Sequence, residues 1–142
     1  ADEEYNPRRR YYASKLANLL FTHELDRRLR AKGSSTIAVA AHPGASDTEL
    51  TRYVTGLTGM LTRAIMPVMR PLMNTAEQGA WPIEFAATAP GVEGGQYFGP
   101  GGRMEMSGPA RQVDSSEASK DRDKAKRLWD LSTEMTGIDP GL

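Results

Sequence analysis

A tyrosine and a lysine four residues apart are the side chains in this sequence with the clearest chemical potential. Tyr11 and Lys15 lie in the stretch YYASKLANLLF, residues 11–21. A phenol is a poor acid or base near neutral pH, because its ordinary pKa is about 10, but a nearby positive charge favours its ionised form. Residues four apart leave the same face of a helix, so Lys15 is placed to favour ionisation of Tyr11. An isolated pair of this kind is more often two ordinary surface residues, and only its context can decide.

The pair opens a predicted helix over residues 10–32, which Gly33 ends. Up to Phe21 the apolar residues point nearly all round this helix, which predicts packing on most of its sides. Asn18 and Thr22 continue the face of the tyrosine and the lysine, so a polar row interrupts the apolar surface. Such a row faces either water or a site.

The second half of the same helix is rich in charge. Glu24 precedes Arg28 and Asp26 precedes Arg30 by four residues, which is the acid-first order that stabilises helices. We expect these charged side chains to face water.

A buried strand and a sharp turn follow the helix. TIAVAAH, residues 36–42, is apolar without alternation, which is typical of a strand covered on both faces in a parallel sheet. Pro43 and Gly44 then force a turn, and ligands bind at such carboxyl ends of parallel strands. Thr48 follows the turn. His42 is interpreted as a structural histidine, because nothing nearby in sequence would be its partner.

The remainder of the chain predicts four further elements: a proline-broken apolar segment over 50–73, a helix over 75–88, a strand over 95–99 and a final helix over 116–136. Thr75 and Gln78 form a capping box for the first of these helices, and residues 101–114 are interpreted as loop. Four methionines in the segment 50–73 suit an adaptable apolar lining, although plain core packing explains them too. Two short parallel strands cannot stand alone, so the chain is expected to be part of a larger sheet.

Composition excludes several classes of protein. Eighteen basic and eighteen acidic residues cancel, which gives no electrostatic case for binding nucleic acid. Cysteine is absent, so disulfides, thiolate metal sites and cysteine nucleophiles are excluded. No stretch reaches the roughly 20 apolar residues of a membrane span. We expect a cytoplasmic protein without a metal site.

Several segments together resemble a known family. YYASKLANLLFTHELDRRL followed by AAHPGASDTEL is similar to the C-terminal half of a short-chain dehydrogenase/reductase, in the retinol-dehydrogenase and WW-domain-oxidoreductase-like branch. TAEQGAWPIEFAATAPGVEGGQYFGPGG and KRLWDLSTEMTG fit the last sheet region and the final helix of that branch. The resemblance covers about residues 10–137. It implies an α/β fold, the C-terminal part of a doubly wound parallel sheet of Rossmann type.

The resemblance also implies roles for individual residues. Tyr11 matches the catalytic tyrosine, which exchanges a proton with the substrate oxygen during hydride transfer. Lys15 matches the lysine that favours the ionised tyrosine and holds the nicotinamide ribose. Pro43 and Gly44 match the turn beside the nicotinamide, and Thr48 matches a hydroxyl that contacts the cofactor. The implied activity is NAD- or NADP-dependent interconversion of an alcohol and a carbonyl on a small molecule. We expect the segment 50–73 and the loop 101–112 to form the substrate lid, and their apolar content suggests a lipophilic substrate.

The sequence departs from the family in what it lacks. No glycine-rich dinucleotide fingerprint is present, and the family's catalytic serine and relay asparagine belong upstream of Tyr11. Two explanations compete: a fragment whose partner is the missing N-terminal half, or a half-domain that serves as a non-catalytic interaction or structural module. We favour the first, and expect that this chain alone neither folds stably nor binds a dinucleotide. A homo-oligomer is also possible through the long helix.

Overall fold

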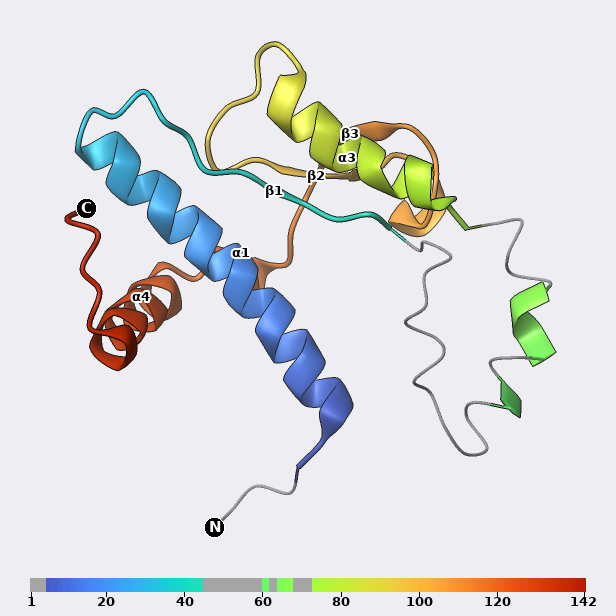
Figure 1. Cartoon of the computed structure of the whole chain (residues 1–142), viewed down its shortest axis with the longest axis horizontal. Helices are drawn as coiled ribbons and strands as arrows, with labels where there is room; N and C mark the ends of the chain where they lie inside the picture. The colour runs from blue at the N-terminus through green and yellow to red at the C-terminus, as the bar shows by residue number, and fades with distance from the viewer. Residues whose placement is uncertain (1–4, 45–59, 62–63, 68–72) are drawn as a thin grey trace. The chain divides into compact units, whose positions relative to one another are not determined.

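The computed structural model describes residues 5–44, 60–61, 64–67 and 73–142. The chain divides into two compact units. The first, here the helical unit, comprises Ala1–Ala40, Glu93–Gln96 and Asp114–Leu142; the second, the sheet unit, comprises Ala41–Val92 and Tyr97–Val113. Taken together, the two units contain both helices and strands, and the strands form one small three-stranded sheet (Figure 1). Within the described ranges, the helices are too short or too polar to cross a membrane.

Helix α1, Pro7–Ala31, is the long helix that the sequence predicts, but it begins three residues earlier. Asn6 is its N-cap, since its side chain accepts a hydrogen bond from the Arg9 amide at 3.0 Å, and Pro7 supplies a preset helical φ. The predicted end is confirmed. Gly33 has a φ of 66°, and the Ser34 amide donates to the Leu29 carbonyl at 3.0 Å, which closes the helix in a Schellman motif.

Helix α4, Arg122–Thr136, packs beside the second half of α1 within the helical unit (Figure 1). The ring of its Trp129 stacks on Phe21 with centroids 5.3 Å apart. The prediction that the helix starts at 116 is wrong, because a separate 3₁₀ turn, η4 (Glu117–Lys120), comes first and Asp121 caps α4. Met135 lies in the last turn of α4 and is 78% exposed.

The sheet has the order β1-β2-β3, with β1 at Ala40–Ala41, β2 at Tyr97–Pro100 and β3 at Ala110–Val113. The Ala40 amide donates to the Gln96 carbonyl and the His42 amide to the Phe98 carbonyl. Because both partners increase in residue number in the same direction, β1 and β2 pair in parallel. β2 and β3 pair antiparallel.

Strand boundaries differ from the predicted ones. The predicted strand 36–42 is regular only at Ala40–Ala41, since its ladder has a partner on one side in the described part of the chain. The predicted strand 95–99 lies instead at Tyr97–Pro100. β3 lies inside the predicted loop 101–114, where the pairing with β2 makes a strand of a segment without an apolar pattern.

Helix α3, Ala76–Thr88, covers the sheet within its unit (Figure 1). The predicted capping box is confirmed: Gln78 and Thr75 exchange side-chain and backbone hydrogen bonds at 2.9 and 3.1 Å. Pro82 lies in the middle of the helix rather than in its first turns, and it is buried. Phe85 contacts Phe98 of β2 with ring centroids 5.5 Å apart.

The predicted substrate lid is described in part. Its loop 101–112 contains the 3₁₀ turn η3 (Arg103–Glu105) and most of β3. In the segment 50–73, residues 60–61 and 64–67 are helical. Thr48 and residues 50–59, 62–63 and 68–72 lie outside the described ranges.

Candidate active site

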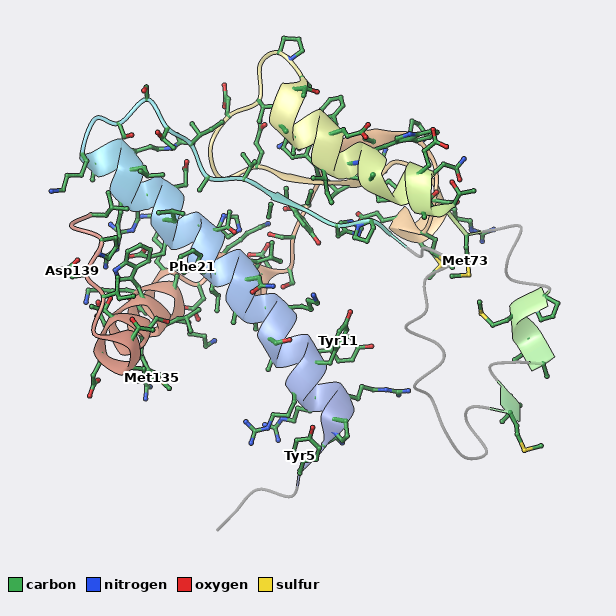
Figure 2. All side chains as sticks on the ribbon, in the orientation of Figure 1. Tyr5, Tyr11, Phe21, Met73, Met135 and Asp139 are labelled. Carbon is green, nitrogen blue, oxygen red and sulfur yellow. The ribbon has the colours of Figure 1, made fainter. Side chains whose placement is uncertain are left out.

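Tyr11 and Lys15 lie together on one face of α1, as the sequence predicts. The Lys15 Nζ lies 5.6 Å from the centroid of the Tyr11 ring. Both side chains are exposed, Tyr11 to 48%, and Figure 2 shows Tyr11 projecting from the early turns of the helix. Among the described residues, neither the Tyr11 hydroxyl nor the Lys15 ammonium has a hydrogen bond or an ion pair. Both groups are therefore free to meet a ligand.

The polar row continues along α1 only in part. Asn18 is exposed, but the Thr22 hydroxyl donates to the Asn18 carbonyl at 2.9 Å and so serves the helix itself. The first apolar side chain to be buried is Leu20. The prediction that the first half of α1 is packed on most sides is thus wrong for this chain, because its described neighbours in the helical unit, α4 and η4, cover the second half.

The charged half of α1 is the better packed one. The expected ion pairs form, with Arg28 Nε 2.7 Å from Glu24 and Arg30 Nε 2.7 Å from Asp26. Arg27 also donates two hydrogen bonds to the Glu24 carboxylate, at 2.6 and 2.9 Å. The prediction that these charges all face water is wrong, since both carboxylates are buried.

The cause of this burial is the chain that returns to the helix. Asp26 lies against Gly94, and the Ala38 amide donates to its carboxylate at 3.4 Å. Arg28 lies over the Trp129 ring, 4.6 Å from the ring centroid. Burial would raise the pKa of Glu24, but the hydrogen bonds and charges of its two arginines outweigh that effect and lower it.

The Pro43–Gly44 turn belongs to the sheet unit and is tightly built. Gly44 has a φ of 70°, and its amide donates to Nδ1 of His42 at 3.2 Å. A Cβ at this position would lie 2.6 Å from both the Met106 carbonyl oxygen and Cγ of Pro100. Only glycine fits this position without displacing its neighbours.

Two partners of this turn were not found from sequence. Asn74 is buried and donates to the Pro43 carbonyl at 3.1 Å. Nε2 of His42 lies 3.3 Å from Oε2 of Glu105, which is far along the chain, but it forms no hydrogen bond within the described residues. The His42 ring also contacts Tyr97, whose pKa is raised by burial and further by the Glu105 charge. Asn74 and Glu105 belong to no predicted helix or strand, and no local pattern distinguishes them.

The structure thus places each half of the predicted site in its own unit: Tyr11 and Lys15 in the helical unit, Pro43 and Gly44 in the sheet unit. That the two halves serve one cofactor stays a prediction. What the described residues define is an α/β protein with a Tyr-x-x-x-Lys helix and a parallel strand that ends in a Pro-Gly turn.

Comparison with known proteins identifies the family. The chain is 36% identical over 140 residues to retinol dehydrogenase 12 of Homo sapiens, a match that covers 97% of this chain and 39% of that protein. It is 34% identical over 140 residues to polyprenol dehydrogenase of Mus musculus, covering 96% and 38%. A solved structure of an uncharacterized protein from Mycobacterium paratuberculosis superposes with a TM-score of 0.72 at 35% identity, covering 99% of this chain and 43% of that one. No family model matches the chain.

The chain belongs to the short-chain dehydrogenase/reductase family and corresponds to its C-terminal part. The chain spans about two fifths of the length of the curated relatives it matches.

Proposed function

We propose that this chain is the C-terminal half of an NAD(P)-dependent oxidoreductase that interconverts an alcohol and a carbonyl on a lipophilic small molecule. The observation that carries the proposal is the Tyr11–Lys15 pair, exposed on one helix face with Nζ 5.6 Å from the ring centroid. The names of the relatives of this chain, retinol dehydrogenase and polyprenol dehydrogenase, support a lipophilic alcohol as substrate.

The residues present suit a nicotinamide cofactor. Within the described residues, Lys15 offers an ammonium without a hydrogen bond, which suits the hydroxyls of a ribose, and Tyr11 offers a phenol likewise without one. Pro43 and Gly44 form a turn in which Gly44 has a φ of 70° and close neighbours. Position 44 therefore accepts only a residue without a side chain. Thr48 would add a hydroxyl to the cofactor contacts.

Proton transfer is the part of the reaction that this chain would perform. In the oxidation direction, the Tyr11 phenolate takes the proton of the substrate hydroxyl; in reduction, the phenol returns it to the carbonyl oxygen. The positive charge of Lys15 stabilises the phenolate. A nicotinamide cofactor, when bound, would supply or accept the hydride. Positioned acids and bases of this kind contribute about 10²–10⁴-fold to rate.

Two features support a missing N-terminal half as the partner that completes the fold. β1 is at the edge of the described sheet although its pairing is parallel, and an open edge of a parallel sheet calls for a further strand. The first half of α1 exposes Tyr11, Tyr12 and Ala13, a surface that a further layer would cover. We therefore propose that the full-length fold is a doubly wound sheet of Rossmann type, with the pyrophosphate cradle in the other half.

The test is nicotinamide-cofactor binding, measured by the fluorescence of NADH and NADPH. The chain alone is compared with the full-length protein that contains it. We expect binding by the full-length protein and none by the chain alone. Absence of binding in both would refute the oxidoreductase proposal and favour a non-catalytic module.

A further inference from the structure

Asn74 is a buried polar side chain that no motif explains. It is 2% exposed and comes just before the capping box of α3. Its Nδ2 donates to the Pro43 carbonyl at 3.1 Å, and its Oδ1 accepts from the Gly108 amide at 3.2 Å. One short side chain thus joins two segments that are far apart in sequence.

The chemistry of the two partners fixes the orientation of this amide. The Pro43 carbonyl can only accept and the Gly108 amide can only donate, so each end of the Asn74 side chain has one possible role. Aspartate, which has the same shape, keeps the acceptor for Gly108 but turns a second oxygen toward the Pro43 carbonyl. The two bonds can therefore be separated by an isosteric substitution.

The segment that Asn74 ties to the turn, residues 101–108, also touches the turn directly. A Cβ at Gly44 would lie 2.6 Å from the Met106 carbonyl oxygen and 2.8 Å from that of Glu105. Met104 and Glu105 both have left-handed φ values, 55° and 54°, which cost energy for residues with a Cβ and persist only where the surroundings hold them. The turn and this loop form one packed body within the sheet unit, joined by the Asn74 amide.

We propose that Asn74 is a positioning residue that fixes the Pro43–Gly44 turn in the conformation that receives the nicotinamide cofactor, an inference that rests on the proposed function. Asn74 acts through Pro43 and itself touches neither substrate nor cofactor. A protein in which the turn is correctly placed only a tenth of the time binds its ligand about tenfold more weakly. In Asn74→Asp a carboxylate oxygen faces the Pro43 carbonyl oxygen, and two acceptors without a proton between them disfavour this conformation of the turn.

The experiment compares Asn74→Asp with a matched control, Ser119→Ala, in the full-length protein. Ser119 is 0% exposed and its hydroxyl bonds Ser116 and Ser115 at 2.6 and 2.8 Å, but it lies in the helical unit. Two quantities are measured: the dissociation constant of NAD(P)H, and amide hydrogen exchange in the cofactor-free protein over residues 42–44 and 106–109. If Asn74→Asp does not fold, Asn74→Ala replaces it, since alanine removes both hydrogen bonds without adding a charge.

We expect the Asn74 variant to bind NAD(P)H about tenfold more weakly and to exchange faster in both segments, with Ser119→Ala unchanged in both respects. Equal effects of the two variants would show general destabilisation and overturn the inference. Unchanged affinity and exchange in Asn74→Asp would overturn it alone and leave the proposed function standing. A wild-type protein that binds neither cofactor would overturn the proposed function and the inference together.

Discussion

The first half of α1 carries the proposed catalytic pair, and the second half carries the buried, ion-paired carboxylates. The first half carries Tyr11 and Lys15 on an exposed face, and the second half carries Glu24 and Asp26 buried among their arginine partners. From sequence the reverse distribution is expected, because the first half is the apolar one. The difference teaches that burial along this helix follows the position of α4 and of segment 93–96, not the hydrophobicity of the helix itself.

The two halves of α1 also differ in what covers them. The second half is completed within the chain, since Trp129 stacks on Phe21 and two arginines neutralise Glu24. The first half has apolar and aromatic side chains without cover in the described part of the chain, which is the surface that a further portion of the fold is proposed to bury. Substitutions in the two halves should therefore separate activity from stability.

The largest expected effect is that of Tyr11→Phe in the full-length protein. Loss of the hydroxyl should lower turnover about 10³-fold, since it removes the proposed acid and base, while the midpoint of thermal unfolding stays the same because the hydroxyl makes no hydrogen bond within the described residues. Tyr12→Phe is the matched control, one residue away and more exposed. Steady-state alcohol oxidation measures both. Equal rates in the two variants would remove Tyr11 from the mechanism.

Trp129→Ala should have the next largest effect, on stability rather than chemistry. Trp129 is 6% exposed and contacts both Phe21 and Arg28, so its loss should cost about 3 kcal/mol of unfolding free energy. Glu134→Ala, at an exposed position of α4, should change it by about 0.5 kcal/mol or less. Urea unfolding followed by circular dichroism gives both values. A Trp129 variant as stable as the wild type would contradict the packing of α4 on α1.

Glu24→Gln should destabilise the protein by about 2 kcal/mol, because it weakens charge-assisted hydrogen bonds to Arg27 and Arg28. Burial opposes ionisation, but the arginines prevail, so the folded-state pKa of Glu24 lies below its ordinary 4.5. The stability difference should be complete above about pH 4.5 and disappear as the pH falls through the lowered folded value. Glu117→Gln, which alters an exposed ion pair with Lys120, is the control. A difference independent of pH would refute the ionic contribution.

Lys15→Met should have the smallest effect of the four. It removes the charge but keeps an apolar stem, so turnover near neutral pH should fall about tenfold and the pH profile should move to more alkaline values. Lys32→Met, at the C-terminal end of α1, is the control. Turnover is measured across the neutral and alkaline range, and a profile that does not move would count against an electrostatic role for Lys15.

Local signals in the sequence predicted what local forces decide. The capping box of Thr75 and Gln78 and the stop at Gly33 are confirmed, since each depends on residues within one helical turn. The parallel pairing of the strand before Pro43 is confirmed as well. The Tyr-x-x-x-Lys spacing correctly placed both side chains on one face, because helix geometry alone determines it.

The features that the sequence did not predict depend on contacts between distant segments. β3 has no apolar alternation and forms because β2 offers a ladder. Asn74 and Glu105 lie outside every predicted helix and strand, yet the folded chain brings Asn74 to the Pro43 carbonyl and Glu105 to within 3.3 Å of His42. The burial of Asp26 follows from the approach of Gly94, which no helix pattern contains.

Gly94 has a consequence for which sequences this fold can accept. A Cβ at position 94 would overlap the Asp26 carboxylate, while the Gly94 carbonyl accepts from Arg30, and the next amide, that of Gly95, donates to the Ala38 carbonyl at 2.7 Å. In a saturation library of the full-length protein selected for folding, position 94 should tolerate glycine alone, with alanine already depleted. A residue without a side chain would then be among the most constrained positions in the domain, although it takes no part in the chemistry.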